Sequence, residues 1–395
     1  MPLQFLPQCC DANLYLDIGA QCAATNDCYH ALRPMGANLW FSLPFRLGLP
    51  ADSLMALHAA LLALSVWLSV NALRTLLPGS LSMPQRSGLW LASSIAHAVF
   101  FLPVTFYALS DAPAALFVLI ACWLLLWQRA AATPRSIILQ MTTAGLLLGL
   151  AAWVRTFYLA PLALMLPYWL FMLRHRARRT AIAGLILAAL LPVCVQYATT
   201  YSRFGALSFM APAATQSMYL DHFWEPAGGY DTLASNKPLY WHATCDGNVP
   251  VYKAFFARSF SEHACIFNNR LHFYLGSYGA ATYLLDDETL RIQHAQQHFL
   301  PQLLESFGAT RHWSPFWFLL NAIALITAAQ LLYRHWQRIH PTGRSATCFA
   351  LLCFLEAFPL SPEQRFLIVP MTMAWLLAAT HVIAPHHNKQ PSDQQ

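Results

Sequence analysis

The chain has 395 residues, of which 57% are hydrophobic and only 10% are charged, with a formal net charge of +6. A soluble domain carries about 25% charged residues, so the composition excludes a soluble globular protein of this size. The basic residues lie between apolar runs and form no single patch, which argues against a nucleic-acid partner. The sequence therefore predicts an all-α polytopic membrane protein.

The N-terminal segment 1–52 is predicted to be an outer-face loop that contains an amphipathic helix. Asp11 and Tyr15 are four residues apart, so they would share one face of that helix. Two interpretations stay open for Asp11: a solvated acid on an exposed helix, or a general base held at the membrane surface. Further along, Arg33 and Pro34 mark a turn before an aromatic stretch.

Nine apolar runs follow, and a helix needs about 20 such residues to cross the hydrocarbon layer. We expect about nine membrane-spanning helices, near 53–73, 89–107, 112–128, 136–154, 156–173, 180–200, 315–333, 345–360 and 366–384. The run 345–360 is the weakest, because it is short and contains Glu356. The runs 136–154 and 156–173 are separated only by Arg155. They predict either two short spans that meet at a turn or one span plus a re-entrant piece.

The basic residues between the runs predict which side of the membrane each segment faces. Of the 23 Lys and Arg residues, 12 lie in short segments on one side, 4 lie on the other, and 7 fall in the long loop. Long loops do not count in the positive-inside rule, so the richer side faces the cytosol. The sequence thus predicts transmembrane helices over 53–200 and 315–385, a mixed extracytoplasmic loop domain over 201–314 and a cytosolic tail over 386–395.

Three charged positions on the predicted outer face could carry chemistry. Asp111 follows Ser110 in a very short link and precedes Pro113, so it suits a helix N-cap as well as a site acid. Arg155 sits at membrane depth, which is costly unless the side chain faces a cavity or a partner. It could snorkel to the interface, or bind an anion such as a lipid phosphate through paired N–H donors. Arg365 opens the last run on the same face, where an ordinary interfacial charge is the simpler interpretation.

The long loop offers two pairs of residues with a defined spacing. Cys245 and Cys265 lie 20 residues apart in a potentially oxidising compartment, and they predict a disulfide. His294 and His298 are four residues apart, which suits metal binding on a helix, but no third ligand is identifiable. A divalent metal is therefore possible, and no cofactor is assigned. The aromatic residues of the loop suit sugar stacking, and they equally suit a small domain core or an interfacial belt.

Taken in chain order, several of these pieces resemble the membrane-embedded glycosyltransferases of the GT-C class, in particular the bacterial protein-mannosyltransferase and aminoarabinose-transferase-like group. The matching pieces are Asp11 and Tyr15 followed by Arg33-Pro34-x-Gly36, then Ser110-Asp111-Ala112-Pro113, the run from Gly145 to Arg155, the step from Tyr201 to Gly205, and Arg365-Phe366 with Pro370. In that family a span precedes the first outer loop, so we expect a further span upstream of the printed sequence. The acid of that loop is often followed by Glu, whereas here Ala12 follows Asp11.

The resemblance implies a glycosyltransferase that moves a sugar from a polyprenyl-phosphate carrier to a lipid, glycan or protein acceptor. The reaction would take place on the extracytoplasmic face of a bacterial inner membrane. The resemblance makes Asp11 the general base, while Asp111 would position the acceptor or orient an arginine. The substrate-binding residues that it implies are Tyr15, Arg33, Arg155 and Arg365. Arginines in this role would neutralise the departing lipid phosphate.

Two other classes of protein stay open. A transporter or flippase of lipid-linked sugars would need polar residues along a path through the membrane, often with broken helices. A non-catalytic membrane subunit could keep the same fold without activity, and the feature that favours it is that the printed sequence lacks the family's first span. The polar residues of this chain concentrate at the predicted outer face, which favours chemistry at the membrane surface.

Overall fold

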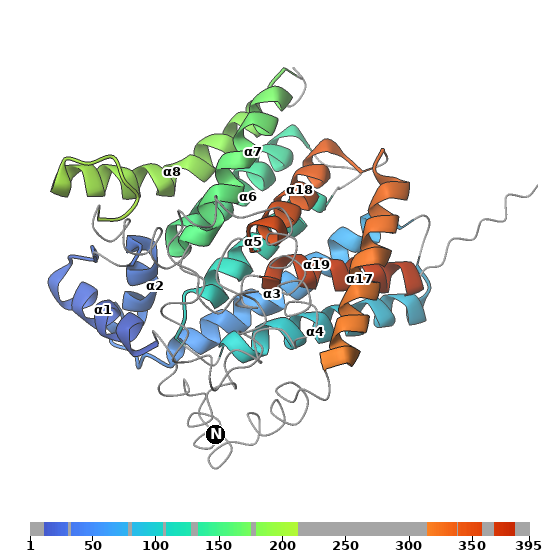
Figure 1. The fold of residues 1–395 in the computed structure, drawn as a ribbon, viewed down its shortest axis with the longest axis horizontal. Helices are drawn as coiled ribbons and strands as arrows, with labels where there is room; N and C mark the ends of the chain where they lie inside the picture. Colours follow the sequence, from blue (N-terminus) through green and yellow to red (C-terminus); the bar gives the residue numbers. More distant parts are fainter. Residues whose placement is uncertain are drawn as a thin grey trace, which may run out of the picture.

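All regular secondary structure in the described part of the chain is helical (Figure 1). The computed structural model describes residues 12–30, 33–77, 81–105, 108–127, 133–174, 179–211, 314–337, 339–357 and 367–383. The all-α class is confirmed for these residues. Most of the predicted loop domain and the cytosolic tail lie outside them.

Each of the nine predicted apolar runs contains a helix. Two shorter helices come first, α1 (Ala12–Thr25) and α2 (Met35–Arg46). The runs then form α3 (Ser53–Leu76), α4 (Met83–Thr105), α5 (Asp111–Leu126), α6 (Pro134–Val154), α7 (Leu159–Met172), α8 (Arg179–Phe204), α17 (Ser314–His335), α18 (Pro341–Ala357) and α19 (Ile368–Ile383).

Four of these helices, α3, α6, α8 and α17, contain stretches that are long and apolar enough to cross a bilayer. Shorter apolar helices cover Asp111–Leu126, Thr156–Met172 and Ile368–Ile383. Helices of this length and composition are those of an integral membrane protein. That all nine runs cross the bilayer stays a prediction.

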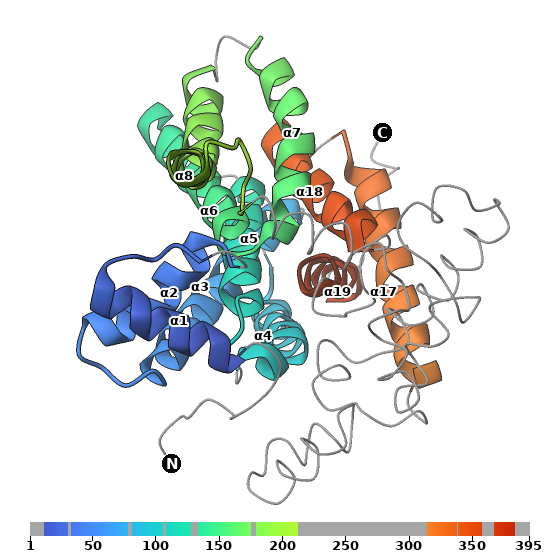
Figure 2. The ribbon, with the colours of Figure 1, turned by 60° about the vertical axis from the view of Figure 1, so that its left-hand side comes forward.

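Helix α5 lies at the centre of the bundle (Figure 2). Every residue of α5 except Leu124 is buried, because α3, α4, α6, α18 and α19 all pack against it. A helix that is apolar on all sides is stable only with neighbours on all sides. The first residue of this enclosed helix, Asp111, is therefore held firmly in position.

Glycines bring α6 and α8 into close contact. Gly145 faces the backbone carbonyl of Leu185, and Gly149 faces that of Ala189. The two glycines are four residues apart and share one face of α6, so the α8 backbone lies directly against that face. Small residues allow this close approach between helices in a membrane, where van der Waals packing drives association.

The helical path breaks at Arg155. Helix α6 ends at Val154, and Arg155 adopts an extended conformation with φ −139° and ψ 116°. A single 3-10 turn, Thr156–Tyr158, then leads directly into α7. The chain thus forms two helices on either side of this point, and they meet at a turn with Arg155 at the junction.

Candidate functional site

Ser110 links three elements that are distant in the sequence. The hydroxyl oxygens of Tyr15 and Ser110 lie 2.9 Å apart, and Nη1 of Arg155 donates a hydrogen bond to the Ser110 hydroxyl at 3.2 Å. Nη2 of the same guanidinium forms an ion pair with Asp111 at 3.2 Å. Side chains from α1, the start of α5 and the end of α6 therefore meet at one point.

The ion pair between Arg155 and Asp111 is largely buried, with exposed side-chain fractions of 16% and 4% respectively. Removing one partner of a buried pair leaves an uncompensated charge and costs about 3–5 kcal/mol. The remaining exposure belongs mainly to Arg155, so its guanidinium can reach a ligand while Asp111 stays covered. Asp111 also lies in the first turn of α5, where the helix dipole favours a carboxylate.

The prediction that Asp111 is the N-cap residue of a helix is wrong. Helix α5 begins at Asp111 itself, and Ser110 occupies the N-cap position without a side-chain capping hydrogen bond. The Asp111 carboxylate contacts Arg155 instead. Ser110 at the end of the link and Asp111 at the start of α5 thus both direct their side chains to Arg155 at the end of α6.

Tyr15 and Arg33 form the other side of this group. The Tyr15 ring is only 2% exposed and packs against the Phe41 ring of α2 at a centroid distance of 5.1 Å. The guanidinium carbon of Arg33 lies 5.4 Å from the centroid of the Tyr15 ring, a cation–π contact. The pKa of His30 is lowered mainly by burial and secondly by the positive charge of Arg33. Arg33 thus contacts the Tyr15 ring, and Arg155 contacts the Ser110 hydroxyl to which Tyr15 is linked.

Gln196 of α8 fixes the elements that carry these residues. Its Oε1 accepts hydrogen bonds from the Met35 backbone N–H and from Nε1 of Trp153, each at 3.0 Å. Its Nε2 donates to the Phe209 carbonyl at 2.8 Å. Because Gln196 is only 1% exposed, these bonds join α2, α6 and α8 in a dry environment. Trp153 lies two residues before Arg155, so the same bonds fix the end of α6.

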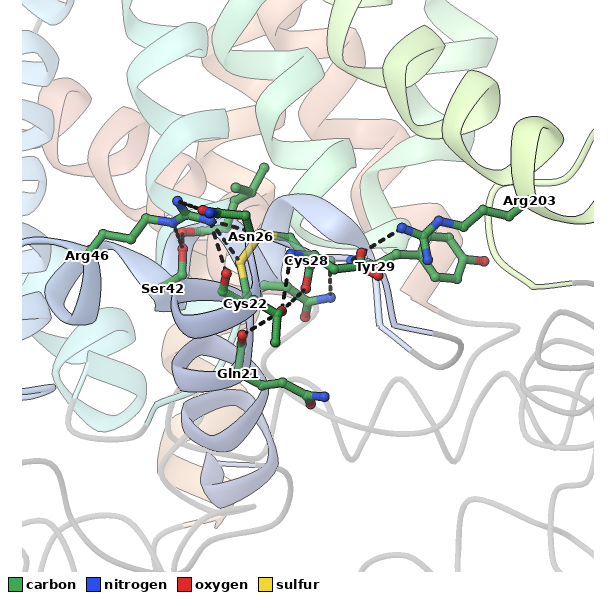
Figure 3. The surroundings of a disulfide bond; sticks show 12 residues. Gln21, Cys22, Asn26, Cys28, Tyr29, Ser42, Arg46 and Arg203 are labelled. Carbon is green, nitrogen blue, oxygen red and sulfur yellow. Dashed lines mark hydrogen bonds and ion pairs between the residues drawn. A yellow bond between two sulfur atoms is a disulfide. The ribbon is translucent and has the colours of Figure 1, made fainter.

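A disulfide between Cys22 and Cys28 closes the turn after α1 (Figure 3). The Cα atoms of the two cysteines are 4.4 Å apart. Arg46 of α2 donates to the Cys22 carbonyl at 3.1 Å and to the Asn26 side-chain oxygen at 2.9 Å. Asn26 has a positive φ of 58°, a conformation that asparagine tolerates well. The disulfide and Arg46 together join α1 to α2, and so hold Tyr15 against Phe41.

The same turn is tied to the end of α8. Asp27 and Arg203 form an ion pair at 2.6 Å, and the Arg203 guanidinium lies 4.6 Å from the Tyr29 ring centroid (Figure 3). The hydrogen bond from Arg203, followed by that from the Tyr29 backbone N–H, lowers the pKa of Asp27. Both partners are substantially exposed, at 40% for Arg203 and 50% for Asp27, so this contact orients the turn more than it stabilises the fold.

The structure thus brings together four of the six predicted catalytic and substrate-binding residues. They are Tyr15, Arg33, Asp111 and Arg155. Asp11 and Arg365 lie outside the described residues, as do Cys245 and Cys265 and the histidines His294 and His298. Within the described part of the chain, no three His, Cys, Asp or Glu residues form a group able to hold a metal ion.

No family model matches the chain, and neither does any curated protein. Two crystal structures of ArnT from Cupriavidus metallidurans are similar in fold. The structure bound to undecaprenyl phosphate has a TM-score of 0.44 and 13% identity, covering 96% of this chain and 74% of that one. The apo structure has a TM-score of 0.42 and 15% identity, covering 97% and 74% respectively.

Proposed function

We propose that this protein is a glycosyltransferase that moves a sugar from a polyprenyl-phosphate carrier to an acceptor on the outer face of the membrane. The observation that carries the proposal is the position of the Arg155 guanidinium. It is oriented by Asp111 and Ser110 at a helix break, on a side chain that is partly exposed. Ser110 in turn contacts Tyr15, whose ring is in cation–π contact with Arg33. Paired N–H donors oriented in this way suit a phosphate. Three of the sequence motifs that resemble GT-C transferases contribute to these contacts: the motif with Tyr15 and Arg33, the motif with Ser110 and Asp111, and the motif that ends at Arg155.

The proposed reaction assigns one role to each polar group. The acceptor hydroxyl oxygen attacks the anomeric carbon of the sugar while its proton passes to Asp11. The bond between that carbon and the phosphate oxygen breaks, and the lipid phosphate leaves with the electron pair. Arg155 stabilises the charge that develops on the phosphate, with Arg33 and Arg365 contributing to the same anion. Asp111 keeps the Arg155 guanidinium in the orientation that this requires.

The buried polar groups within the bundle do not favour the transporter alternative. The clearest cluster of these groups lies between α3 and α4. There the Ser65 hydroxyl oxygen is 2.9 Å from Nε2 of His97, and the hydroxyl oxygens of Ser69 and Ser93 are 2.5 Å apart. All four side chains are 0–1% exposed, and each has a hydrogen-bond partner. Such a cluster joins two helices and presents no polar surface to a passing solute.

The proposal is tested first by binding of the lipid. The full chain in lipid nanodiscs should bind undecaprenyl phosphate, and Arg155→Ala should weaken the affinity roughly ten- to hundredfold, the range for a lost hydrogen bond to a charged group. Arg155→Lys should recover only part of the affinity, because lysine lacks the paired donors. Since Arg155→Ala also leaves Asp111 without this ion pair, the Lys variant shows whether a loss reflects binding or folding.

Arg174→Ala is the matched control, because Arg174 is an exposed arginine beyond the opposite end of α7. It should bind the lipid as the wild type does. Transfer is then measured with a panel of radiolabelled polyprenyl-phosphate sugars, and Asp11→Asn should abolish transfer while the protein remains folded. Unchanged lipid affinity in Arg155→Ala, or full transfer by Asp11→Asn, would contradict the proposed roles.

A further inference from the structure

Glu356 has a buried carboxylate oxygen that neither the folding of the bundle nor the proposed phosphate site explains. It is the penultimate residue of α18, within one of the apolar runs. Its Oε2 atom is buried and accepts no hydrogen bond from the described residues. A buried carboxylate is costly unless a hydrogen-bond donor or a cation meets it. A binding partner from outside the described chain would offset that cost.

Glu356 lies on the side of α18 that faces the proposed site. Near the start of α18, Thr342 donates to the Leu125 carbonyl, and one turn later the Cys122 thiol donates to the Ala346 carbonyl. Helix α18 therefore runs antiparallel to α5, so its last turn lies level with the first turn of α5 at Asp111. The buried face of α18 includes Ala346, Phe349 and Cys353, and Glu356, three residues after Cys353, continues that face. The end of α18 thus places a second carboxylate level with the group that Asp111 and Arg155 form.

The charge of Glu356 indicates which part of a ligand it can contact. A carboxylate repels a phosphate, so Glu356 is unsuited to the lipid phosphate that Arg155 would hold. It accepts hydrogen bonds well, and charge-assisted hydrogen bonds are stronger than neutral ones. The part of a polyprenyl-phosphate sugar that offers such donors next to its phosphate is the sugar ring with its hydroxyl groups.

Resting on the proposed function, we infer that Glu356 binds a hydroxyl group of the carrier-linked sugar and so helps to distinguish the loaded carrier from the bare lipid phosphate. Arg155 then recognises what the donor and the spent carrier share, and Glu356 recognises what only the donor has. Such a division favours release of the carrier after transfer, because the lipid phosphate loses one of its contacts with the protein when the sugar leaves.

The test compares undecaprenyl phosphate with the same lipid carrying glucose, mannose or galactose, each bound to the full chain in nanodiscs. At least one sugar-bearing lipid should bind the wild type more tightly than the bare lipid. Glu356→Leu should remove most of that difference, about tenfold or more in affinity, and leave the affinity for the bare lipid unchanged. Glu356→Gln keeps one acceptor oxygen, so its sugar-dependent difference in affinity should lie between those of the wild type and Glu356→Leu.

Thermal stability separates this role from a structural one. Glu356→Leu removes a carboxylate with one buried oxygen that accepts no hydrogen bond from the described residues, and it changes the volume little. The melting temperature of this variant should therefore equal or exceed that of the wild type. Leu355→Ala is the control, because Leu355 is next to Glu356 in the sequence and is 52% exposed. This variant should bind all the lipids normally. The inference is overturned if Glu356→Leu keeps the sugar-dependent difference, if it weakens both lipids equally, or if no sugar increases the wild-type affinity. Failure of the wild type to bind the bare lipid would instead overturn the proposed function.

Discussion

Gly36 offers a direct test of how the proposed site is assembled. It lies in α2, three residues after Arg33, and packs against the end of α6. A Cβ atom added at Gly36 would lie 2.6 Å from the Trp153 carbonyl oxygen and 2.7 Å from its Cγ atom. Ordinary van der Waals contact begins near 3.4 Å. The change Gly36→Ala should therefore push α2 away from α6 by the difference between 2.6 and 3.4 Å, about 0.8 Å.

The energetic cost follows from what surrounds the added methyl group. Overpacking typically costs about 1–3 kcal/mol, and the upper end applies here because one contact is backbone and the indole is held by Gln196. Alanine regains about 1 kcal/mol as the better helix former, which leaves a net loss of about 2 kcal/mol. Because α1 packs against α2, the shift should also stretch the contact between Tyr15 and Ser110 from 2.9 Å towards the limit of a hydrogen bond.

Thermal unfolding in detergent and affinity for undecaprenyl phosphate together measure these effects, and Gly88→Ala is the matched control. A Cβ atom at Gly88 would meet only the flexible Ile383 side chain at 3.7 Å, so this change should raise stability by up to about 1 kcal/mol. The same substitution is thus expected to lower the melting temperature at Gly36 and to raise it at Gly88. A Gly36→Ala protein as stable as the wild type would refute the close packing of α2 on α6.

Three further predictions concern the N-terminal helices and the topology. Cys28→Ser should cost about 2 kcal/mol of stability, the entropy of closing the short loop between Cys22 and Cys28, and reduction should shift the wild-type melting temperature but not that of the variant. The pKa of Asp27 is lowered from 3.8 in the folded state, so its contribution is present above about pH 4 and is lost as the pH falls through the folded value. Melting scans from pH 6 down to pH 3 should show this small loss in the wild type, whereas Asp27→Asn should lack it. A cysteine introduced at Ser235, in the predicted outer loop, should react with a membrane-impermeant reagent added from the outside, and labelling only after membrane disruption would invert the topology.

The helices could be predicted because bilayer insertion leaves a strong local signal. The uncharged run before Arg74 predicts the span that α3 forms, and the runs on either side of Arg155 predict the two helices that meet there. Their boundaries shift by a few residues, as at Met83, where α4 begins earlier than the apolar run because polar residues can continue a helix beyond the hydrocarbon layer.

The contacts within the site could not be predicted, because they join residues that are distant in the sequence. Asp111 and Arg155 could be selected as costly charges in apolar surroundings, but nothing in either segment indicates that they pair. Ser110 was singled out only as the neighbour of Asp111, although its hydroxyl contacts both Tyr15 and Arg155. Glu356 was noted only because it weakened the prediction of a span over 345–360. It could have been selected as an ionisable residue at membrane depth, which by default marks a functional site.

The disulfide between Cys22 and Cys28 was missed for a related reason. The two cysteines are 6 residues apart, and such a spacing does not by itself select a pair. The fold selects it, because Arg46 and Asn26 hold the turn in which the two cysteines meet.

The helix break at Arg155 also bears on how the chain enters the membrane during synthesis. Only Arg155 and one 3-10 turn separate α6 from α7, so in the predicted topology the two helices would enter the bilayer together, with Arg155 at the tip that crosses. Because α5 is made first, Asp111 would already be inserted when that tip crosses, and the ion pair could form on arrival. The order of synthesis thus supplies the counter-ion before the charge that needs it, and a permuted chain in which α5 followed the hairpin would have to carry the arginine across without its partner.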